Sequence, residues 1–235
     1  LHRLEYRGYD SAGVAILNSK LNVYKCKGKV SDLEHFANKK DTGGNIGIGH
    51  TRWATHGMPN DANAHPHFSQ SGESVIIHNG IIENYASLKK ALQKRGHKFR
   101  SDTDTEVLIH LIEDIQKNEN VPLPEAVRLA LNEVIGAYAI VVLSKNNPNE
   151  LIVAKKSSPI VIGIGKGEFF VASDATPIVE YSRNVVYLED DEIAIIPRKG
   201  KLRIKTIRNK TKTPYSQTLE LNLESIEKGG FPHFM

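Results

Sequence analysis

The first part of the chain alternates short apolar runs with segments whose apolar residues recur at helical spacing. Apolar runs bounded by polar turns predict strands, and the predicted strands cover residues 14–17, 21–24, 46–50 and 74–78. Apolar residues that return every three or four positions predict helices, which cover residues 31–39, 84–95, 103–115 and 122–134. Thr103 and Glu106 stand at capping-box spacing, and Gly96 and Gly136 are typical residues to end a helix.

From residue 137 onward the pattern changes to strands. The predicted strands cover residues 137–143, 151–154, 160–164, 169–172, 185–188 and 193–196, followed by a basic strand pair after residue 200. Residues 174–181 can form a short helix between two of them. The run at 139–143 is apolar without alternation, which indicates a strand buried on both faces. Strands and helices in separate blocks therefore predict an α+β domain, with two sheets sandwiched between helices.

Composition and charge narrow the function classes. With 235 residues and 40% hydrophobic content, the chain can bury the core of one large domain. The net charge of +4 comes from basic segments at 20–29 and 197–212, which lack an aromatic ladder, so we expect no nucleic-acid partner. No apolar run reaches about 18 residues, and we expect no membrane partner. A lone cysteine, Cys26, is typical of a reducing compartment and predicts a cytoplasmic protein.

Polar side chains cluster where the apolar run at 46–49 ends. The residues that follow it are His50, Thr51, Arg52, Trp53, Thr55, His56 and Gly57. Arg52 can bind a carboxylate through two hydrogen bonds, and its threonine and histidine neighbours offer more. This pattern predicts a pocket for a small anionic or zwitterionic ligand. The alternative is an ordinary strand end whose basic side chains pair with surface carboxylates.

Two further positions carry candidate chemistry. Asn79 and Gly80 lie between an apolar strand and a helix, where a side-chain amide and a backbone N–H can together stabilise an oxyanion. The pair is also common in turns that have no chemical role. Asp104 begins a predicted helix, where a carboxylate is favoured by the helix dipole. Its functional interpretation is a partner for the ammonium group of a ligand.

Five motifs resemble, in order, the glutaminase domains of glutamine–fructose-6-phosphate aminotransferases, also called glucosamine-6-phosphate synthases. The motifs are EYRGYDSAG at 5–13, HTRWATHG at 50–57, NAHPH at 63–67, HNGIIEN at 78–84 and TDTE at 103–106. The resemblance implies a class II glutamine amidotransferase with the αββα sandwich of N-terminal-nucleophile hydrolases, in which two mostly antiparallel sheets lie between helix layers.

The resemblance also implies roles for these residues. Arg52, Thr55 and His56 resemble the residues that bind the α-carboxylate of L-glutamine, and Trp53 resembles a wall of the same loop. Asp104 resembles the acceptor of the α-ammonium group, helped by the Gly80 carbonyl. The Asn79 side chain and the Gly80 N–H resemble the oxyanion hole, and Arg7 resembles an arginine beside the nucleophile. No cofactor and no metal are implied.

In the family an N-terminal cysteine attacks the glutamine amide with its own α-amine as base, and ammonia then passes to a C-terminal sugar isomerase module that converts fructose 6-phosphate to glucosamine 6-phosphate. Residue 1 here is Leu, so we expect these 235 residues to lack the nucleophile and to be inactive alone. Cys26 lies between two lysines and has no free α-amine, so it does not replace it. We expect the amidotransferase domain to cover 1–228, a linker to begin at 229–235, and the full enzyme to be a homo-oligomer.

Three alternatives stay open from the sequence. The chain can belong to another class II amidotransferase, or to a non-catalytic domain that binds glutamine. A third reading is a metal-binding domain built from His50, His56, His65, His67 and His78. These histidines lack the helical spacing of common metal motifs.

Overall fold

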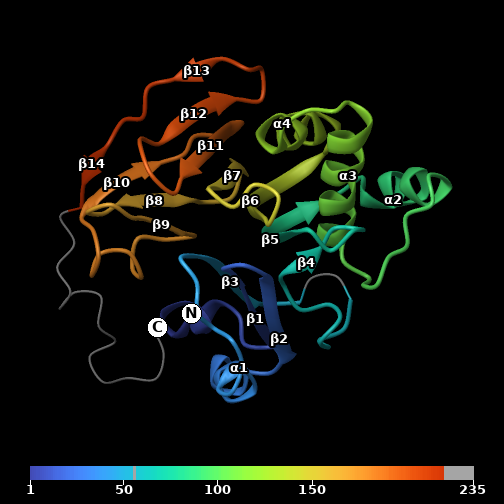
Figure 1. Ribbon diagram of the computed structural model, residues 1–235, viewed down its shortest axis with the longest axis horizontal. Helices are drawn as coiled ribbons and strands as arrows, with labels where there is room; N and C mark the ends of the chain where they lie inside the picture. The colour runs from blue at the N-terminus through green and yellow to red at the C-terminus, as the bar shows by residue number, and fades with distance from the viewer. Residues whose placement is uncertain (55–56, 220–235) are drawn as a thin grey trace.

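The protein is described by a computed structural model that covers residues 1–54 and 57–219 (Figure 1). Thr55, His56 and the predicted linker at 229–235 lie outside the described residues. No helix in the described part of the chain has the length and apolar character needed to cross a membrane.

A seven-stranded antiparallel sheet forms the centre of the molecule. Its strand order is β13-β12-β11-β7-β6-β5-β4. The strands are β4 (His67–Phe68), β5 (Ser74–Ile82), β6 (Gly136–Ser144), β7 (Glu150–Lys156), β11 (Glu192–Pro197), β12 (Arg203–Thr206) and β13 (Thr211–Lys212). Strand β6 is buried along most of its length, as its unbroken apolar run predicts, because both faces of the sheet are covered.

Two smaller sheets lie on one side of this central sheet. The first has the order β2-β1-β3, and the second has the order β14-β10-β8-β9. The first is built from β1 (Ser11–Leu17), β2 (Leu21–Lys27) and β3 (Ile46–Arg52). The second is built from β8 (Val161–Ile164), β9 (Phe169–Ala172), β10 (Asn184–Tyr187) and β14 (Gln217–Thr218). Side chains from both sheets, such as Ile48 and Ile162, share one core with Val141 and Val153 of the central sheet.

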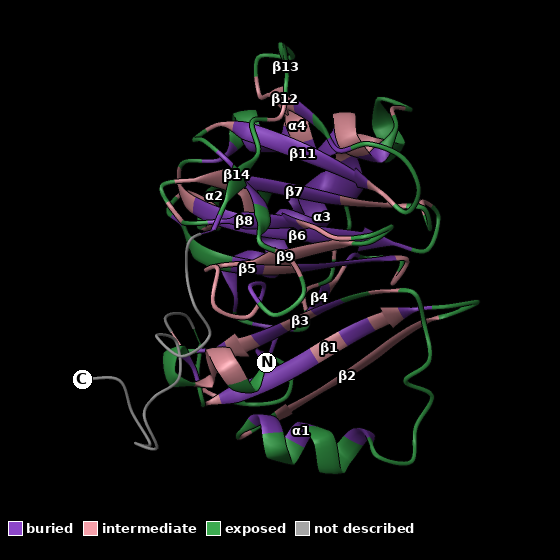
Figure 2. Ribbon diagram, turned by 90° about the vertical axis from the view of Figure 1, so that its left-hand side faces the viewer, coloured by how far each residue is buried: buried purple, intermediate pink, exposed green. Residues whose placement is uncertain are grey.

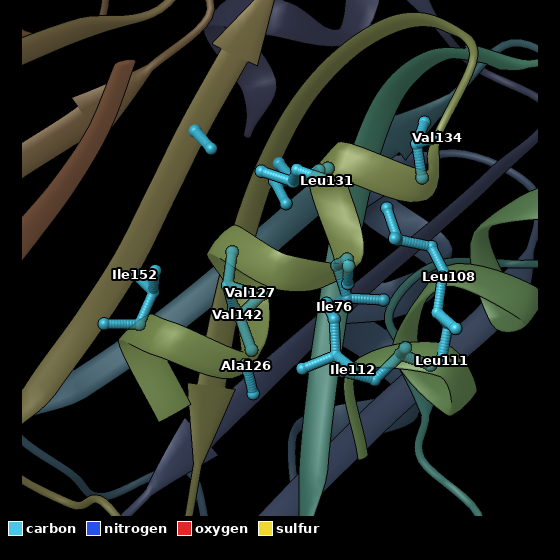
Figure 3. Packing of buried hydrophobic residues seen from close by; sticks show 14 of the residues in the cluster. Ile76, Leu108, Leu111, Ile112, Ala126, Val127, Leu131, Val134, Val142 and Ile152 are labelled. Carbon is cyan, nitrogen blue, oxygen red and sulfur yellow. The ribbon is translucent and has the colours of Figure 1, made fainter. Parts of the chain in front are cut away.

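Helices cover the outer faces. The helices are α1 (Val30–Ala37), α2 (Tyr85–Lys94), α3 (Asp104–Asn118) and α4 (Leu123–Glu133), and a 3-10 helix, η1, covers His2–Arg7. Figure 3 shows α3 and α4 side chains such as Leu108 and Leu131 packing with Ile76 and Val142 of the central sheet. On the other side, α1 packs on β1 and β2 through Val30 and Leu33 (Figure 2). The order helix, sheet, sheet, helix confirms the predicted α+β sandwich.

Three details differ from the sequence prediction. The layer that faces the central sheet consists of two hydrogen-bonded sheets rather than one, because the edge strands β3 and β9 do not pair with each other. Residues 174–181 form successive turns rather than a helix, closed by hydrogen bonds such as Val179 N to Ala175 O. The third difference is the position of Asn79 and Gly80, which lie inside strand β5 rather than after it.

Candidate active site

A pocket of about 470 Å³ opens between the small sheets and the central sheet. Its walls come from β3, from β5 and β6, from the start of α3, and from residues 171–173 at the end of β9. The described residues to which the family resemblance assigns a role all line it: Arg7, Arg52, Trp53, Asn79, Gly80 and Asp104. The fold thus brings together candidates that lie up to about one hundred positions apart in the sequence.

Arg52 is the last residue of β3 and is held from two directions. Its side chain is only 4% exposed, and Nη2 donates to the carbonyl oxygen of Gly57 at 3.2 Å. Nη1 lies 3.8 Å from Oδ1 of Asp10, the residue before β1. Because β1 and β3 are adjacent, Asp10 and Arg52 lie side by side, and the backbone N–H of Asp10 donates to the carbonyl oxygen of Arg52 at 3.2 Å. The guanidinium is therefore a fixed positive charge at the pocket wall.

The chain after Arg52 is anchored by the same aspartate. Oδ2 of Asp10 accepts a short hydrogen bond from the backbone N–H of Ala54, and Oδ1 accepts one from the Ser11 hydroxyl at 2.8 Å. Trp53, between Arg52 and Ala54 in the chain, is 61% exposed, and its ring lies 5.5 Å from the ring of Tyr9 in an edge-to-face arrangement. Trp53 thus lies at the rim of the pocket, as a wall residue would.

Asn79 and Gly80 lie in β5 opposite Ala139 and Tyr138 of β6. The predicted order of strand, Asn-Gly and helix is corrected here, because the β5–β6 ladder continues to Ile82 before the chain leaves the sheet. Gly80 has φ +136°, and a Cβ atom at this position would come within 2.1 Å of the Ala137 carbonyl oxygen. Only glycine allows this backbone, which exposes Asn79 and Gly80 to the pocket in a strand otherwise well buried.

Asp104 is the first residue of α3 and is 4% exposed. Its Oδ2 accepts the backbone N–H of Ile82 at 2.7 Å, so the helix start is tied to the end of β5. Thr103 accepts the Glu106 N–H and caps the helix, which confirms half of the predicted capping box. The Glu106 carboxylate instead accepts from the backbone of Arg100 and Ser101.

Arg7 ends η1 and lines the pocket. Its side chain is 45% exposed, and Nη1 lies 3.5 Å from Oδ2 of Asp174. The Tyr6 hydroxyl donates to the same carboxylate oxygen at 3.2 Å. These contacts fix η1 against the turns that follow β9.

Four histidines, His50, His65, His67 and His78, are buried, and all of them except His67 line the pocket. Their side-chain partners are hydroxyls and one amide: His65 and His78 lie 3.1 and 3.0 Å from Oγ1 of Thr105, and His67 lies 3.2 Å from Oγ1 of Thr103. Nε2 of His78 also lies 3.5 Å from the carbonyl oxygen of Ala137. His50 lies 2.8 Å from Oδ1 of Asn79. Burial lowers the pKa of His50 to about 4 and the pKa values of His65 and His67 well below 6.5, so these rings are neutral near pH 7.

The hydrogen-bond partners of these histidines are neutral groups. Among the described residues, no group of three or more His, Cys, Asp and Glu side chains is arranged to hold a metal ion. His56 of the alternative metal hypothesis lies outside the described residues.

Sequence reasoning missed Asp10 and Thr105. Asp10 anchors the segment after β3, and Thr105 joins two histidines and donates to Oδ1 of Asp104 at 3.4 Å. Both residues lie inside motifs that carry the family resemblance, EYRGYDSAG at 5–13 and TDTE at 103–106, and membership of these motifs was the available signal. Residues 158–160 and 171–173 of the opposite wall carry no such signal, because they line the pocket only through the packing of separate sheets.

Comparison with known proteins identifies the family of the chain. A family model described as the glutamine amidotransferase domain matches residues 31–222. The chain therefore belongs to the glutamine amidotransferase domain family.

The most similar curated relatives identify the branch of this family. The chain is 61% identical to a glutamine–fructose-6-phosphate aminotransferase (isomerizing) of Bacteroides thetaiotaomicron and 54% identical to that of Chlorobaculum tepidum. Each match covers 100% of this chain and 39% of the relative, so the chain spans about two fifths of their length. The predicted resemblance to the glutaminase part of these enzymes is confirmed.

A solved structure supports the fold. The glutamine phosphoribosylpyrophosphate amidotransferase of B. subtilis, in complex with ADP and GMP, superposes with a TM-score of 0.74 at 29% identity. That match covers 88% of this chain and 45% of the other.

Proposed function

We propose that the pocket binds L-glutamine and that its residues promote hydrolysis of the side-chain amide to glutamate and ammonia. The observation that carries this proposal is that Arg52 at the end of β3 and Asp104 at the start of α3, of opposite charge and both 4% exposed, line one pocket of about 470 Å³. A zwitterionic amino acid carries one charge for each of them. Asn79 and Gly80 lie in the same pocket, where the reacting amide of glutamine would be bound.

The two charges bind the two ends of the α-amino acid group. Arg52 binds the α-carboxylate, since its guanidinium can donate two parallel hydrogen bonds. Thr55 and His56, which the family resemblance assigns to the same carboxylate, lie outside the described residues. Asp104 accepts the α-ammonium group together with the Gly80 carbonyl, and Trp53 forms the rim above them.

The Asn79 amide and the Gly80 N–H stabilise the oxyanion. When a thiolate attacks the glutamine amide carbon, the carbonyl oxygen becomes negative, and donors placed beforehand lower the barrier. The tetrahedral intermediate then releases ammonia, leaving a thioester that water hydrolyses. Arg7 also lines the pocket, and the family resemblance places this arginine beside the nucleophile.

Cys26 does not supply the nucleophile. It lies on β2 against Ala12, Val30 and Leu33, and it is not among the residues that line the pocket. Burial raises the pKa of its thiol, which disfavours the reactive thiolate. Cys26 is therefore not placed to act as the nucleophile that the family resemblance implies.

We use the term complete enzyme for the polypeptide that joins this domain to its nucleophile and to an acceptor module. In the complete enzyme, a sugar isomerase domain uses the ammonia to convert fructose 6-phosphate to glucosamine 6-phosphate. The names of the most similar relatives support this acceptor. We propose a cytoplasmic homo-oligomer for that enzyme.

The test measures three activities of the complete enzyme: glutamate release from glutamine, glucosamine 6-phosphate formation with glutamine, and the same with ammonia. Replacing Arg52 by Ala should raise the glutamine KM and leave the ammonia-dependent reaction unchanged. Glutamine binding without hydrolysis would identify a non-catalytic domain, and hydrolysis without transfer to fructose 6-phosphate would identify another class II amidotransferase. Absence of both binding and hydrolysis would overturn the proposal.

A further inference from the structure

The Asn79 side chain can serve as an oxyanion donor only in one of its two amide orientations. Its NH₂ group must point into the pocket, because an amide oxygen there would repel the developing negative charge. Rotation of the amide by 180° exchanges the two groups without changing the shape of the side chain. Some contact must therefore select the orientation.

The only hydrogen bond that the described residues make to this amide comes from His50. Its Nε2 lies 2.8 Å from Oδ1 of Asn79, whereas the Asn79 Nδ2 group bonds to none of the described residues. His50 is buried in β3, and Asn79 is exposed in β5, so the contact crosses from one sheet to the other. We propose that neutral His50, protonated at Nε2, is a positioning residue that holds the Asn79 amide with its NH₂ group toward the substrate; this inference rests on the proposed function.

The second ring nitrogen supports this protonation state. Nδ1 of His50 is buried and has no hydrogen-bond partner among the described residues. If the proton were on Nδ1, the only acceptor for this buried N–H would be the His78 backbone, which does not reach Nδ1 with hydrogen-bond geometry, and Nε2 would require the opposite amide orientation. With the proton on Nε2, the N–H bonds to Asn79 and only a lone pair is left unmatched, which is the less costly arrangement.

The surroundings keep His50 neutral. The groups that face it are the His65 ring at a centroid distance of 4.2 Å, His78, the guanidinium of Arg52 and the Asn79 amide. Burial is the main cause that lowers the pKa of His50, and the positive charge of Arg52 adds to it, so a second proton on His50 is disfavoured near pH 7. A neutral ring has a single N–H, and its position therefore decides which way the amide points.

The first test reads the proton directly. The ¹⁵N chemical shifts of the His50 ring, measured in the unliganded protein at pH 7, should show the N–H at Nε2. A proton at Nδ1 would overturn the inference. This measurement needs no substrate, so it decides the orientation of the amide even if the proposed function fails.

The second test separates positioning from packing. In the complete enzyme, His50→Gln keeps a donor that can reach Asn79 and should retain kcat for glutamine within about 3-fold, whereas His50→Leu should lower kcat about 10–100-fold with little change in KM. The matched control is His67→Leu, which removes a ring from the same cluster that does not touch Asn79, and it should lower thermal stability without lowering kcat. The inference is wrong if folded His50→Gln loses as much kcat as His50→Leu, or if the control loses as much.

Discussion

The carboxylate of Asp104 accepts the backbone N–H of Ile82 at 2.7 Å and so joins the first turn of α3 to the end of β5. Oδ2 of Asp104 thus stabilises the fold, while the negative charge of the carboxylate faces the pocket. The two tasks can be separated, because an amide oxygen accepts the same hydrogen bond without carrying the charge.

Asp104→Asn should therefore raise the glutamine KM of the complete enzyme by about 10–100-fold, since a charge-assisted hydrogen bond contributes roughly 1.5–3 kcal/mol. Its melting temperature should change little. Asp104→Ala should raise KM as much and also lower the melting temperature, because the Ile82 N–H is left buried without an acceptor. Steady-state kinetics and calorimetry of both variants check the division. An unchanged KM in Asp104→Asn would remove Asp104 from the binding site.

Asn79→Ala should behave differently, because its amide acts on the transition state rather than on bound glutamine. We expect kcat for glutamine to fall about 10²–10³-fold, with KM changed little. The ammonia-dependent reaction should stay intact, and it serves as the control for folding. A variant that raised KM at constant kcat would show that the Asn79 amide binds the ground state only.

Asp10→Asn tests the anchor after β3. The carboxylate accepts the Ala54 N–H and lies 3.8 Å from Arg52, so the amide should weaken both contacts without leaving a cavity. We expect a KM increase of about 3–30-fold from loss of a partly buried charged contact, with kcat nearly unchanged. Asp61→Asn is a matched control, because Asp61 accepts a backbone N–H from Lys27 outside the pocket. Equal effects of the two substitutions would contradict the anchoring role.

The buried histidines predict a loss of stability in mild acid. In the folded protein the pKa of His50 is lowered to about 4, whereas in the unfolded chain it returns to about 6.5. Between these values the unfolded state binds more protons, so the free energy of unfolding falls as pH falls from 6.5 toward 4. Each buried histidine with a lowered pKa should reduce the free energy of unfolding by on the order of 1 kcal/mol for each pH unit by which the pH falls in this range.

Denaturant unfolding at pH 7, 6 and 5 measures this slope. His67→Gln should make the slope shallower, because one titrating group is removed. His35→Gln is the control, since His35 is exposed on α1 and its replacement should leave the slope unchanged. A wild-type stability that does not change between pH 7 and 5 would contradict the neutral, buried state of the cluster.

Apolar periodicity predicted most helices and strands correctly because the faces that it marks are those that the layers bury. It failed at Asn79 and Gly80, where composition favours a turn but pairing with β6 keeps the chain extended. The hydrogen bonds between β5 and β6 outweigh the local preference of Asn79 and Gly80 for a turn. The backbone conformation required there, with φ +136° at Gly80, is one that glycine adopts without strain. The sequence pattern was also wrong at residues 174–181, where it predicted a short helix and the structure has successive turns.

The charged site residues were predictable because Arg52 and Asp104 stand at element ends, where side chains reach a ligand. The roles of Asp10 and His50 were not. Asp10 matters because β1 lies beside β3, and His50 matters because β3 faces β5 across the pocket. Such relations depend on strand order and layer packing, which no local pattern of residues contains.

Arg52 belongs to the three-stranded sheet, whereas Asp104 begins a helix packed on the seven-stranded sheet. A folding intermediate with only one of these layers in place would hold half of the pocket and would bind an amino acid weakly. A ligand that needs both charges would then bind only the fully assembled domain and would stabilise it by mass action. The affinity for glutamine would thus also measure how completely the two layers have docked.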